Sequence, residues 1–273
     1  MLQLQIETTT YCNSRCVFCP HHKMKRTRES MDMDLFKKII DEAAALPLIS
    51  QICLTGLGET LMDKQLLERV DYVRRRMPTI HLDMFTNGHL FTAELYRELA
   101  KRRLTKLYVS LNAVRPEQRK AIMGLSDYDQ VVSELRKAIA LKLLATPIVV
   151  KAVVNPDLLG GDDITEFERN WNGMYCEGGN AFLHTEGNWA GDTWRMRTPP
   201  THICTRVMMA IMVLVDGRVA QCCFDTDGRY ILGDLRTETI KDVFNSEKAT
   251  ALRLAMSEGR RDEIELCKGC TGI

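Results

Sequence analysis

The chain lacks the features that mark several large classes of protein. Its 273 residues carry 37 basic and 36 acidic side chains, and a net charge of +1 excludes binding to nucleic acid through overall charge, though not through a local patch. No apolar run reaches the roughly 18 residues that a membrane span needs. The N-terminal sequence has neither the basic nor the long apolar segment of a secretory signal. We therefore expect a cytoplasmic protein without membrane contact or extended nucleic-acid binding.

Cysteine, by contrast, is abundant. The chain has ten cysteines, and a chain of this length needs no disulfide scaffold in order to fold. In the absence of a secretory signal, clustered cysteines indicate metal ligands or redox groups. Two residues stand alone, Cys53 and Cys176. The others form one group near the N-terminus and one in the last quarter of the chain: Cys12, Cys16 and Cys19, and Cys204, Cys222, Cys223, Cys267 and Cys270.

Strand and helix patterns alternate through the first two thirds of the chain. Six strand–helix units fit in about 195 residues, whereas a complete eight-fold barrel takes about 250. We expect an α/β fold over residues 1–197, either a partial (β/α)6 TIM-like barrel or an open doubly wound sheet. A C-terminal domain, residues 198–273, should contain a hairpin turning at Asp216-Gly217 and a helix over 239–257. The strands of the first domain are expected at 2–8, 51–55, 81–86, 106–112, 148–154 and 181–184.

The N-terminal cysteines follow the first expected strand with the spacing Cys12-x3-Cys16-x2-Cys19. A loop in this position lies where parallel α/β folds form their active sites. Three thiolates leave a tetrahedral zinc ion one ligand short, because structural zinc sites close with four. A cubane [4Fe–4S] cluster held by three cysteines keeps one iron open for a substrate or cofactor. The spacing alone therefore predicts a three-thiolate site, with a structural zinc loop as the alternative.

This motif resembles that of the radical S-adenosylmethionine (radical SAM) superfamily, and further matches extend over residues 1 to about 190. A GLGET segment follows the second strand and resembles the family's GGE segment, although Leu57 replaces its first glycine. The third strand ends in TNG, and the fourth contains VSLNA. The resemblance implies that the following residues bind SAM: Phe18, Gly58, Glu59, Thr86, Asn87, Ser110 and Asn112.

The resemblance also implies the chemistry. A cluster on Cys12, Cys16 and Cys19 would pass an electron to SAM, and the 5′-deoxyadenosyl radical so formed would remove a hydrogen atom from the substrate. The implied cofactors are SAM and a [4Fe–4S] cluster. The implied electron donor is a reductant of the flavodoxin or ferredoxin type.

The C-terminal cysteines resemble those of the SPASM/twitch subgroup of the same superfamily. This resemblance implies one auxiliary [4Fe–4S] cluster on Cys204, Cys222, Cys267 and Cys270, with a spacing similar to that of an aminocyclitol dehydrogenase. A fully ligated cluster suits electron transfer better than substrate binding. Cys223 remains an alternative to Cys222 as the fourth ligand. A four-cysteine zinc ribbon also fits the spacing.

The outcome of the reaction depends on the fate of the substrate radical. If the auxiliary cluster accepts an electron, the result is a two-electron oxidation of a polar small molecule such as a sugar, aminocyclitol or nucleotide, which is the outcome we expect. If Cys223 or Cys176 returns a hydrogen atom, the result is epimerisation. A peptide maturase is a further alternative, and a zinc-binding interaction protein is the non-enzymatic one. The basic segment 21–28 is expected to be a solvated loop, with contact to an anionic substrate as the alternative.

Overall fold

The computed structural model describes residues 1–154, 159–172, 181–185 and 203–270. The chain divides into two compact units, which are described separately. Unit 1 comprises Met1–Tyr11, Cys19–His81 and Gly187–Gly272, and unit 2 comprises Cys12–Phe18, Leu82–Glu186 and Ile273. The predicted domain boundary between residues 197 and 198 lies outside the described residues. Within the described part of the chain, no helix is long and apolar enough to cross a membrane.

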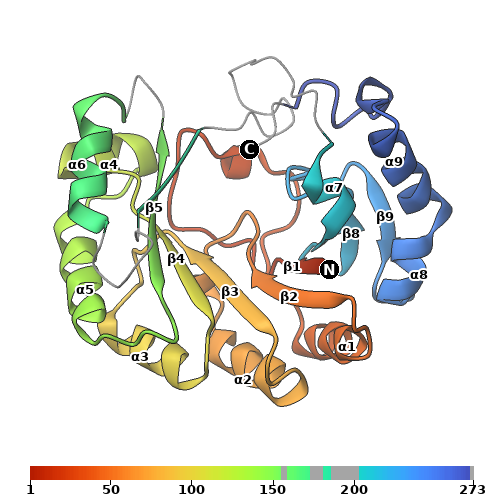
Figure 1. Ribbon diagram of the computed structural model, residues 1–273, viewed down its shortest axis with the longest axis horizontal. Helices are drawn as coiled ribbons and strands as arrows, with labels where there is room; N and C mark the ends of the chain where they lie inside the picture. The colour runs from red at the N-terminus through yellow and green to blue at the C-terminus, as the bar shows by residue number, and fades with distance from the viewer. Residues whose placement is uncertain (155–158, 173–180, 186–202, 271–273) are drawn as a thin grey trace. The chain divides into compact units, whose positions relative to one another are not determined.

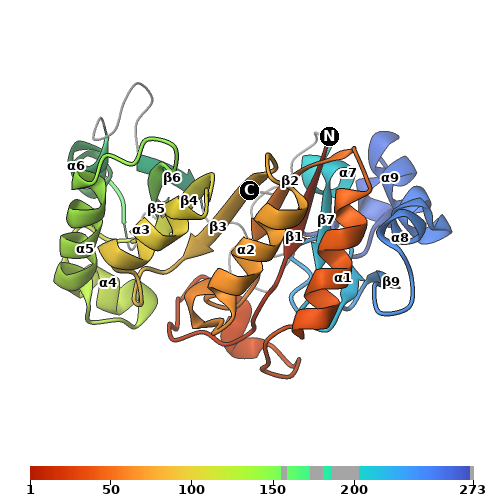
Figure 2. The ribbon, with the colours of Figure 1, turned by 90° about the horizontal axis from the view of Figure 1, so that it is seen from below.

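Unit 1 is built around its first strand. The strand β1 (Leu2–Ile6) pairs in parallel with β2 (Ile49–Leu54) on one side and with β7 (Ala210–Val213) on the other. From β7 the sheet continues antiparallel through β8 (Arg218–Ala220) to β9 (Ile231–Asp234). A strand from the last quarter of the chain therefore lies directly beside the N-terminal strand (Figure 1; both strands are labelled in Figure 2).

Two helices cover β1 and β2 in unit 1, α1 (Met33–Ala44) and α2 (Leu66–Arg76), and Figure 2 shows them side by side. Asp32 caps α1, because its Oδ1 accepts hydrogen bonds from the amides of Asp34 and Leu35 (2.9 and 3.1 Å). The apolar side chains of α1 that recur at helical spacing are buried against the sheet. These include Phe36, Ile39 and Ile40.

The C-terminal helices differ from the prediction. The single helix expected over 239–257 is two helices, α8 (Ile240–Asn245) and α9 (Glu247–Ser257). Ser246 separates them because its backbone is extended (φ −58°, ψ 154°) and its Oγ accepts a hydrogen bond from the amide of Ala249. A short helix, α7 (Thr205–Met209), precedes β7. The turn at Asp216-Gly217 is confirmed, with Gly217 in the left-handed region that glycine favours (φ +89°).

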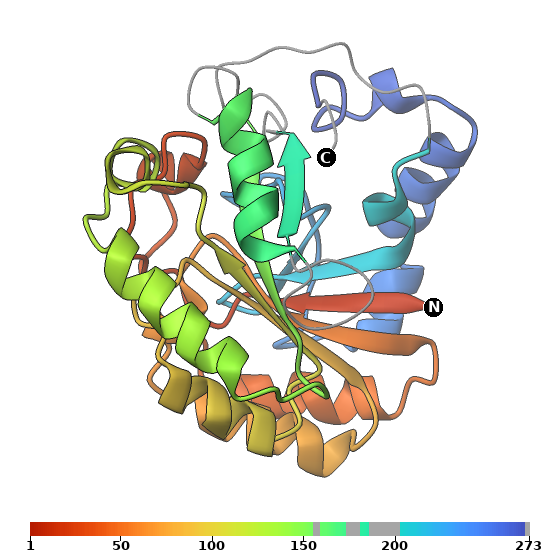
Figure 3. The same ribbon diagram turned by 60° about the vertical axis from the view of Figure 1, so that its left-hand side comes forward.

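Unit 2 contains the strands β3 (His81–Thr86), β4 (Lys106–Ser110), β5 (Ile148–Val154) and β6 (Ala181–Thr185), which pair in parallel in that order. Helices follow these strands along the chain: α3 (Ala93–Lys101), α4 (Pro116–Met123), α5 (Tyr128–Ala140) and α6 (Asp162–Trp171). The helix α6 was not predicted; it buries Phe167 and Trp171 and lies alongside β6 (Figure 3). The alternation of strands and helices confirms the predicted α/β class.

Candidate active site

Cys12 and Cys16, the first two motif cysteines, lie in unit 2 on one short loop. The hydroxyl oxygen of Ser14 lies 3.3 Å from Cys12 Sγ and 3.4 Å from Cys16 Sγ, so one hydroxyl bridges the two thiols. Burial raises the pKa of Cys16 to about 11. A metal that binds this thiol must therefore displace its proton. Phe18, which the resemblance implies beside the adenine, is half-buried at the end of the same loop.

The end of α4 anchors this loop. The amides of Arg15 and Val17 donate hydrogen bonds of 2.9 Å to the carbonyl oxygens of Met123 and Ile122, respectively. The helix ends there because Gly124 takes a left-handed conformation (φ +71°). The backbone between the two cysteines is therefore fixed to a rigid element.

Arg119, a buried residue of α4, connects several strand ends of unit 2. Its guanidinium donates to Asp127 Oδ1 (2.6 Å), to the carbonyl oxygen of Leu111 (3.0 Å) and to that of Asn87 (2.9 Å). The same cation is an electrostatic neighbour of Cys16 and opposes the rise in its pKa. Sequence reasoning missed this residue, because nothing in the local pattern separates it from an ordinary helix-surface arginine.

Thr86 and Asn87, predicted to bind SAM, lie at the carboxyl end of β3. The hydroxyl of Thr86 accepts from the amide of Gly88 (3.0 Å), and Asn87 donates from Nδ2 to Asn13 Oδ1 (2.6 Å). Asn13 lies between the first two motif cysteines in the sequence. The structure thus brings the TNG segment and the cysteine loop of unit 2 together.

Ser110 and Asn112, also predicted to bind SAM, lie at the end of the neighbouring strand β4. Asn112 has a positive φ of 53°, which non-glycine residues rarely adopt. Its Oδ1 accepts a hydrogen bond of 2.9 Å from the amide of Val153 in β5. Asparagine tolerates this conformation better than most residues, and the bond to Val153 holds its side chain at the end of β4.

The predicted SAM-binding residues Gly58 and Glu59 lie in unit 1, directly after β2. A Cβ on Gly58 would lie 2.0 Å from the carbonyl oxygen of Thr9, so only glycine permits this close approach. The amide of Glu59 donates to the carbonyl of Tyr11 (2.8 Å), and its carboxylate accepts from the amide of Leu61 (3.0 Å). The segment therefore packs against the backbone that immediately precedes the cysteine motif.

Cys19, the third motif cysteine, also lies in unit 1, where it begins the short 3₁₀ helix η1 (Pro20–Lys23). Its carbonyl oxygen lies 3.0 Å from His22 Nδ1. The ring of His21 is buried, with Nε2 2.8 Å from the carbonyl oxygen of Thr10. These contacts fix Cys19 and the chain that directly follows it.

Sequence reasoning also missed Glu7, a buried carboxylate at the end of β1. Both carboxylate oxygens accept from the guanidinium of Arg26, at 2.6 and 3.0 Å. The same carboxylate accepts from the amides of Leu57 and Val215, each at 3.1 Å. One side chain therefore joins the GLGET segment, the turn after β7 and the basic segment. The local signal was weak, because Glu7 follows β1 as an ordinary polar residue.

Arg26 extends these contacts to the C-terminal region. Its Nε donates to the carbonyl oxygen of Thr226 (2.7 Å), and the amide of Lys25 donates to Asp227 Oδ1 (2.7 Å). The prediction of a solvated basic loop is therefore wrong for Arg26, although Lys25 is exposed. The segment that follows the first group of cysteines is bonded to the segment that follows Cys222 and Cys223.

The predicted auxiliary ligands all lie in unit 1. Cys267 interacts electrostatically with Cys204 and Cys270, and burial raises the pKa of Cys267 to about 11. Arg261 donates to the carbonyl oxygens of Cys267 (3.2 Å) and Cys270 (2.7 Å) and so fixes the turn between them. Within the described ranges, no three His, Cys, Asp or Glu side chains are already placed to hold a metal ion. The donor set consists of four thiols, of which Cys267 and Cys270 are buried, and thiolates are the ligands that hold iron–sulfur clusters.

Two adjacent thiols compete for the fourth position. Arg206 Nη1 donates to Cys223 Sγ (2.9 Å), whereas Cys222 Sγ accepts from the amide of Phe224 (3.5 Å). The hydrogen bond from Cys222, together with the nearby guanidinium, lowers the pKa of Cys223 to about 6. That same hydrogen bond, with burial, raises the pKa of Cys222. Cys222 as the fourth ligand stays a prediction.

The two isolated cysteines have different outcomes. Cys53 is buried in β2, as expected for a small apolar side chain in the core. Cys176 lies outside the described residues.

Comparison with known proteins decides the family. The sequence model of the Radical SAM superfamily matches residues 6–168, which is more than half of the chain. The chain belongs to the radical SAM superfamily. The model of the SPASM iron–sulfur cluster-binding domain matches residues 204–271. As a radical SAM enzyme with a SPASM domain, the protein uses SAM and [4Fe–4S] clusters as cofactors.

Individual relatives of this radical SAM protein differ in how much of the chain they match. The S-adenosyl-L-methionine-dependent 2-deoxy-scyllo-inosamine dehydrogenase of Niallia circulans is 21% identical over 99% of this chain and 92% of its own length. The GTP 3′,8-cyclase of Desulforamulus reducens is 30% identical, but over 55% of this chain and 46% of its own. The chain spans less than half of that cyclase.

Solved structures confirm the partial (β/α)6 barrel with a C-terminal extension. BtrN in complex with AdoMet and 2-DOIA matches with a TM-score of 0.70 and 20% identity, covering 100% of this chain and 94% of BtrN. SuiB of Streptococcus suis bound to the precursor peptide SuiA matches with a TM-score of 0.72 and 13% identity, covering 99% of this chain and 69% of SuiB. At these identities the likeness establishes the fold.

Proposed function

We propose that this radical SAM enzyme is a dehydrogenase that oxidises a polar small molecule, such as an aminocyclitol, sugar or nucleotide, by two electrons. The observation that carries the proposal is the extent of the match to the 2-deoxy-scyllo-inosamine dehydrogenase, which covers 99% of the chain and 92% of that enzyme. The cyclase match covers 55% of the chain. The C-terminal thiols support it as well, because a second, closed cluster can accept an electron.

We assign the SAM-binding cluster to Cys12, Cys16 and Cys19. The fixed cysteine loop and the glycine-only approach of Gly58 to the backbone before Cys12 support this assignment. We assign the auxiliary cluster to Cys204, Cys222, Cys267 and Cys270. The residues proposed to bind SAM are Phe18, Gly58, Glu59, Thr86, Asn87, Ser110 and Asn112.

Oxidation of an alcohol to a carbonyl removes one hydrogen atom, one electron and one proton. SAM and the clusters, when bound, supply the radical that takes the hydrogen atom and the acceptor for the electron. The proton leaves to a base, and the electron returns to a flavodoxin- or ferredoxin-type protein. The role of the protein is to fix the loops that hold these groups, because a misplacement of about 1 Å can lower the rate about a hundredfold.

Epimerisation by a cysteine hydrogen donor is the second candidate. The contact between Arg206 and Cys223 Sγ disfavours Cys223 in that role, because a guanidinium donor favours the thiolate, which has no hydrogen atom to return. Cys176 stays the alternative donor.

The test is anaerobic turnover of the reconstituted enzyme with SAM, a reductant and a panel of aminocyclitols, sugars, nucleotides and peptides. We expect 5′-deoxyadenosine together with a product lighter by two hydrogens, both measured by mass spectrometry. A product whose mass is unchanged in H2O, and which gains one deuterium when the reaction is run in D2O, would identify an epimerase instead. The Cys16→Ala variant is the control: undiminished 5′-deoxyadenosine formation in it contradicts the assignment of the first cluster.

A further inference from the structure

Arg206 places a positive charge among the thiols of the auxiliary site. It lies on α7, two residues after Cys204, and its Nη1 donates to Cys223 Sγ over 2.9 Å. Its guanidinium carbon lies 5.2 Å from the centre of the Phe224 ring, so an aromatic face holds the group in position. The cation interacts electrostatically with three thiols, those of Cys204, Cys222 and Cys223.

No carboxylate neutralises this charge within the described part of the chain, where Arg206 forms no ion pair. Asp225, the acid that follows Cys222 and Cys223 in the sequence, is buried and accepts from the amides of Arg229 (2.8 Å) and Tyr230 (2.7 Å). The charge of Arg206 is therefore directed at sulfur. If the auxiliary cluster accepts an electron, as proposed above, a positive charge beside it can stabilise its reduced form.

We propose that Arg206 raises the reduction potential of the auxiliary cluster and so makes it a better acceptor of the substrate electron. A cluster held by four thiolates is anionic, and reduction adds one more negative charge. A fixed cation nearby stabilises the reduced form more than the oxidised form, because the Coulomb attraction grows with the charge of the cluster. Net charge and hydrogen bonds to sulfur are general determinants of cluster potentials. The inference holds with either Cys222 or Cys223 as a ligand, and it rests on the proposed function.

The measurement is an EPR-monitored redox titration of the auxiliary cluster alone. Combined replacement of Cys12, Cys16 and Cys19 by alanine removes the other cluster and leaves one signal to follow. In this background, Arg206→Gln keeps an N–H donor without the charge, and Arg206→Met removes both. We expect both variants to titrate at a more negative potential than the parent, with the Met variant shifted further, and Arg206→Lys to stay close to the parent.

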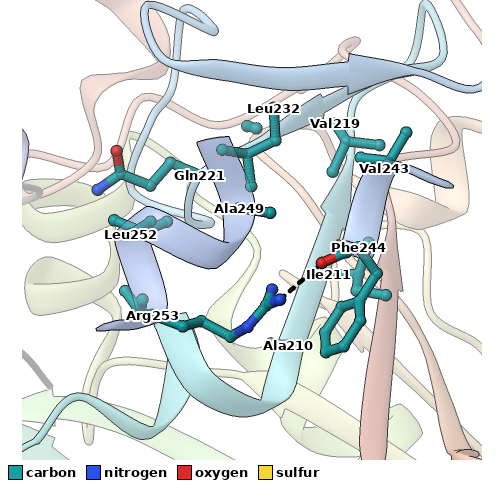
Figure 4. Close-up of a pocket in the computed structure, with 12 residues that line it drawn as sticks. Ala210, Ile211, Val219, Gln221, Leu232, Val243, Phe244, Ala249, Leu252 and Arg253 are labelled. Carbon is teal, nitrogen blue, oxygen red and sulfur yellow. Dashed lines mark hydrogen bonds between the residues drawn. The ribbon is translucent and has the colours of Figure 1, made fainter. Parts of the chain in front are cut away.

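Arg253 on α9 provides a matched control. Figure 4 shows its guanidinium beside Phe244 at a pocket lined mostly by apolar residues of β7, β8, α8 and α9. The guanidinium carbon lies 4.0 Å from the centre of the Phe244 ring, and the group donates to the Phe244 carbonyl oxygen (2.7 Å) rather than to a thiol. Arg253→Met thus removes an arginine–phenylalanine pair of the same kind, and we expect no change in potential.

Several results would overturn the inference. One is an unchanged reduction potential in a neutral Arg206 variant that retains its iron. Another is a shift in the potential of the Arg253→Met variant as large as that of Arg206→Met. If neither neutral variant retains iron, the Arg206→Lys variant decides. A reduction potential near that of the parent supports the charge effect. A clearly more negative potential contradicts it, because lysine keeps the positive charge. The proposed function is tested by a different result. If the reduction potential shifts but the product of the enzyme is an epimer, the role of Arg206 stands and the dehydrogenase proposal is excluded.

Discussion

Glu7 holds three segments of unit 1 with a single carboxylate. The side chains of Glu7 and Arg26 are only 1% and 6% exposed, so this ion pair is shielded from water. A buried pair contributes little net stability compared with apolar packing, but removing one partner leaves the other charge buried and uncompensated. The cost of a single substitution is therefore far larger than the value of the pair.

We expect Glu7→Gln to lower the free energy of unfolding by roughly 3–5 kcal/mol, because the Arg26 guanidinium would lose its only ion-pair partner among the described residues. Denaturant unfolding under anaerobic conditions measures the loss. Glu94→Gln is the control, because Glu94 is 68% exposed and pairs with Arg97 on the surface of α3. Its stability should change by less than about 1 kcal/mol. If both variants lose the same free energy of unfolding, the contacts of Glu7 stabilise the protein no more than a surface ion pair does.

The sequence can predict a functional residue when a local sequence pattern marks it, but not when its role depends on contacts between distant segments. The cysteine triplet, the TNG segment and the glycine before Glu59 are local patterns with fixed spacing. Glu7 and Arg119 acquire their roles only when distant segments meet, and neither has a local pattern to mark it. Arg26 was predicted to be solvated because basic segments usually are, and its burial depends on a carboxylate 19 residues earlier.

At the scale of elements, a helix start with a capping side chain carries a clear local signal. Asp32 and Thr92 are of residue types that commonly cap helices, and both accept hydrogen bonds from the first turns of α1 and α3. Ser246 was predicted to be helical because serine is tolerated in helices, although it is also a common cap. The helix α6 was missed because its apolar pattern is short, with Phe167 and Trp171 four positions apart.

The GLGET segment gives the prediction at this scale. Gly58→Ala would force a Cβ to within 2.0 Å of a backbone oxygen, so the segment must move away from the chain that leads to Cys12. We expect SAM affinity to fall at least about tenfold, a loss of about 1.4 kcal/mol, by equilibrium binding to the reconstituted enzyme. Lys64→Ala, at an exposed position shortly after the same segment, should bind SAM normally. Normal SAM binding by Gly58→Ala would remove this segment from the cofactor site.

For the whole molecule, the two groups of cysteines should separate two functions. Cys204→Ala or Cys270→Ala should leave 5′-deoxyadenosine formation intact while oxidised product disappears, because the electron acceptor is lost. Iron analysis should fall from about eight to about four atoms per chain, the difference of one cubane. Continued formation of oxidised product in a variant that has lost this iron would exclude the acceptor role.

The architecture of the whole chain was predicted from the alternation of strands and helices, which also determines the order of the elements. The place of β7 beside β1 could not be predicted, because a pairing between residues near 4 and near 211 leaves no trace in local periodicity. The domain boundary at 197–198 stays a prediction.

The pairing of β1 with β7, and the bond from Arg26 to Thr226, have a consequence for biosynthesis. Domains generally fold as units as they leave the ribosome, but contacts between distant segments must wait for the later one. The first strand and the basic segment receive these partners only when most of the chain has been translated. The loop that carries Cys12 and Cys16 can form its bonds to the end of α4 much earlier, once Met123 has been translated, so the segments on either side of this loop should be the last to complete their contacts.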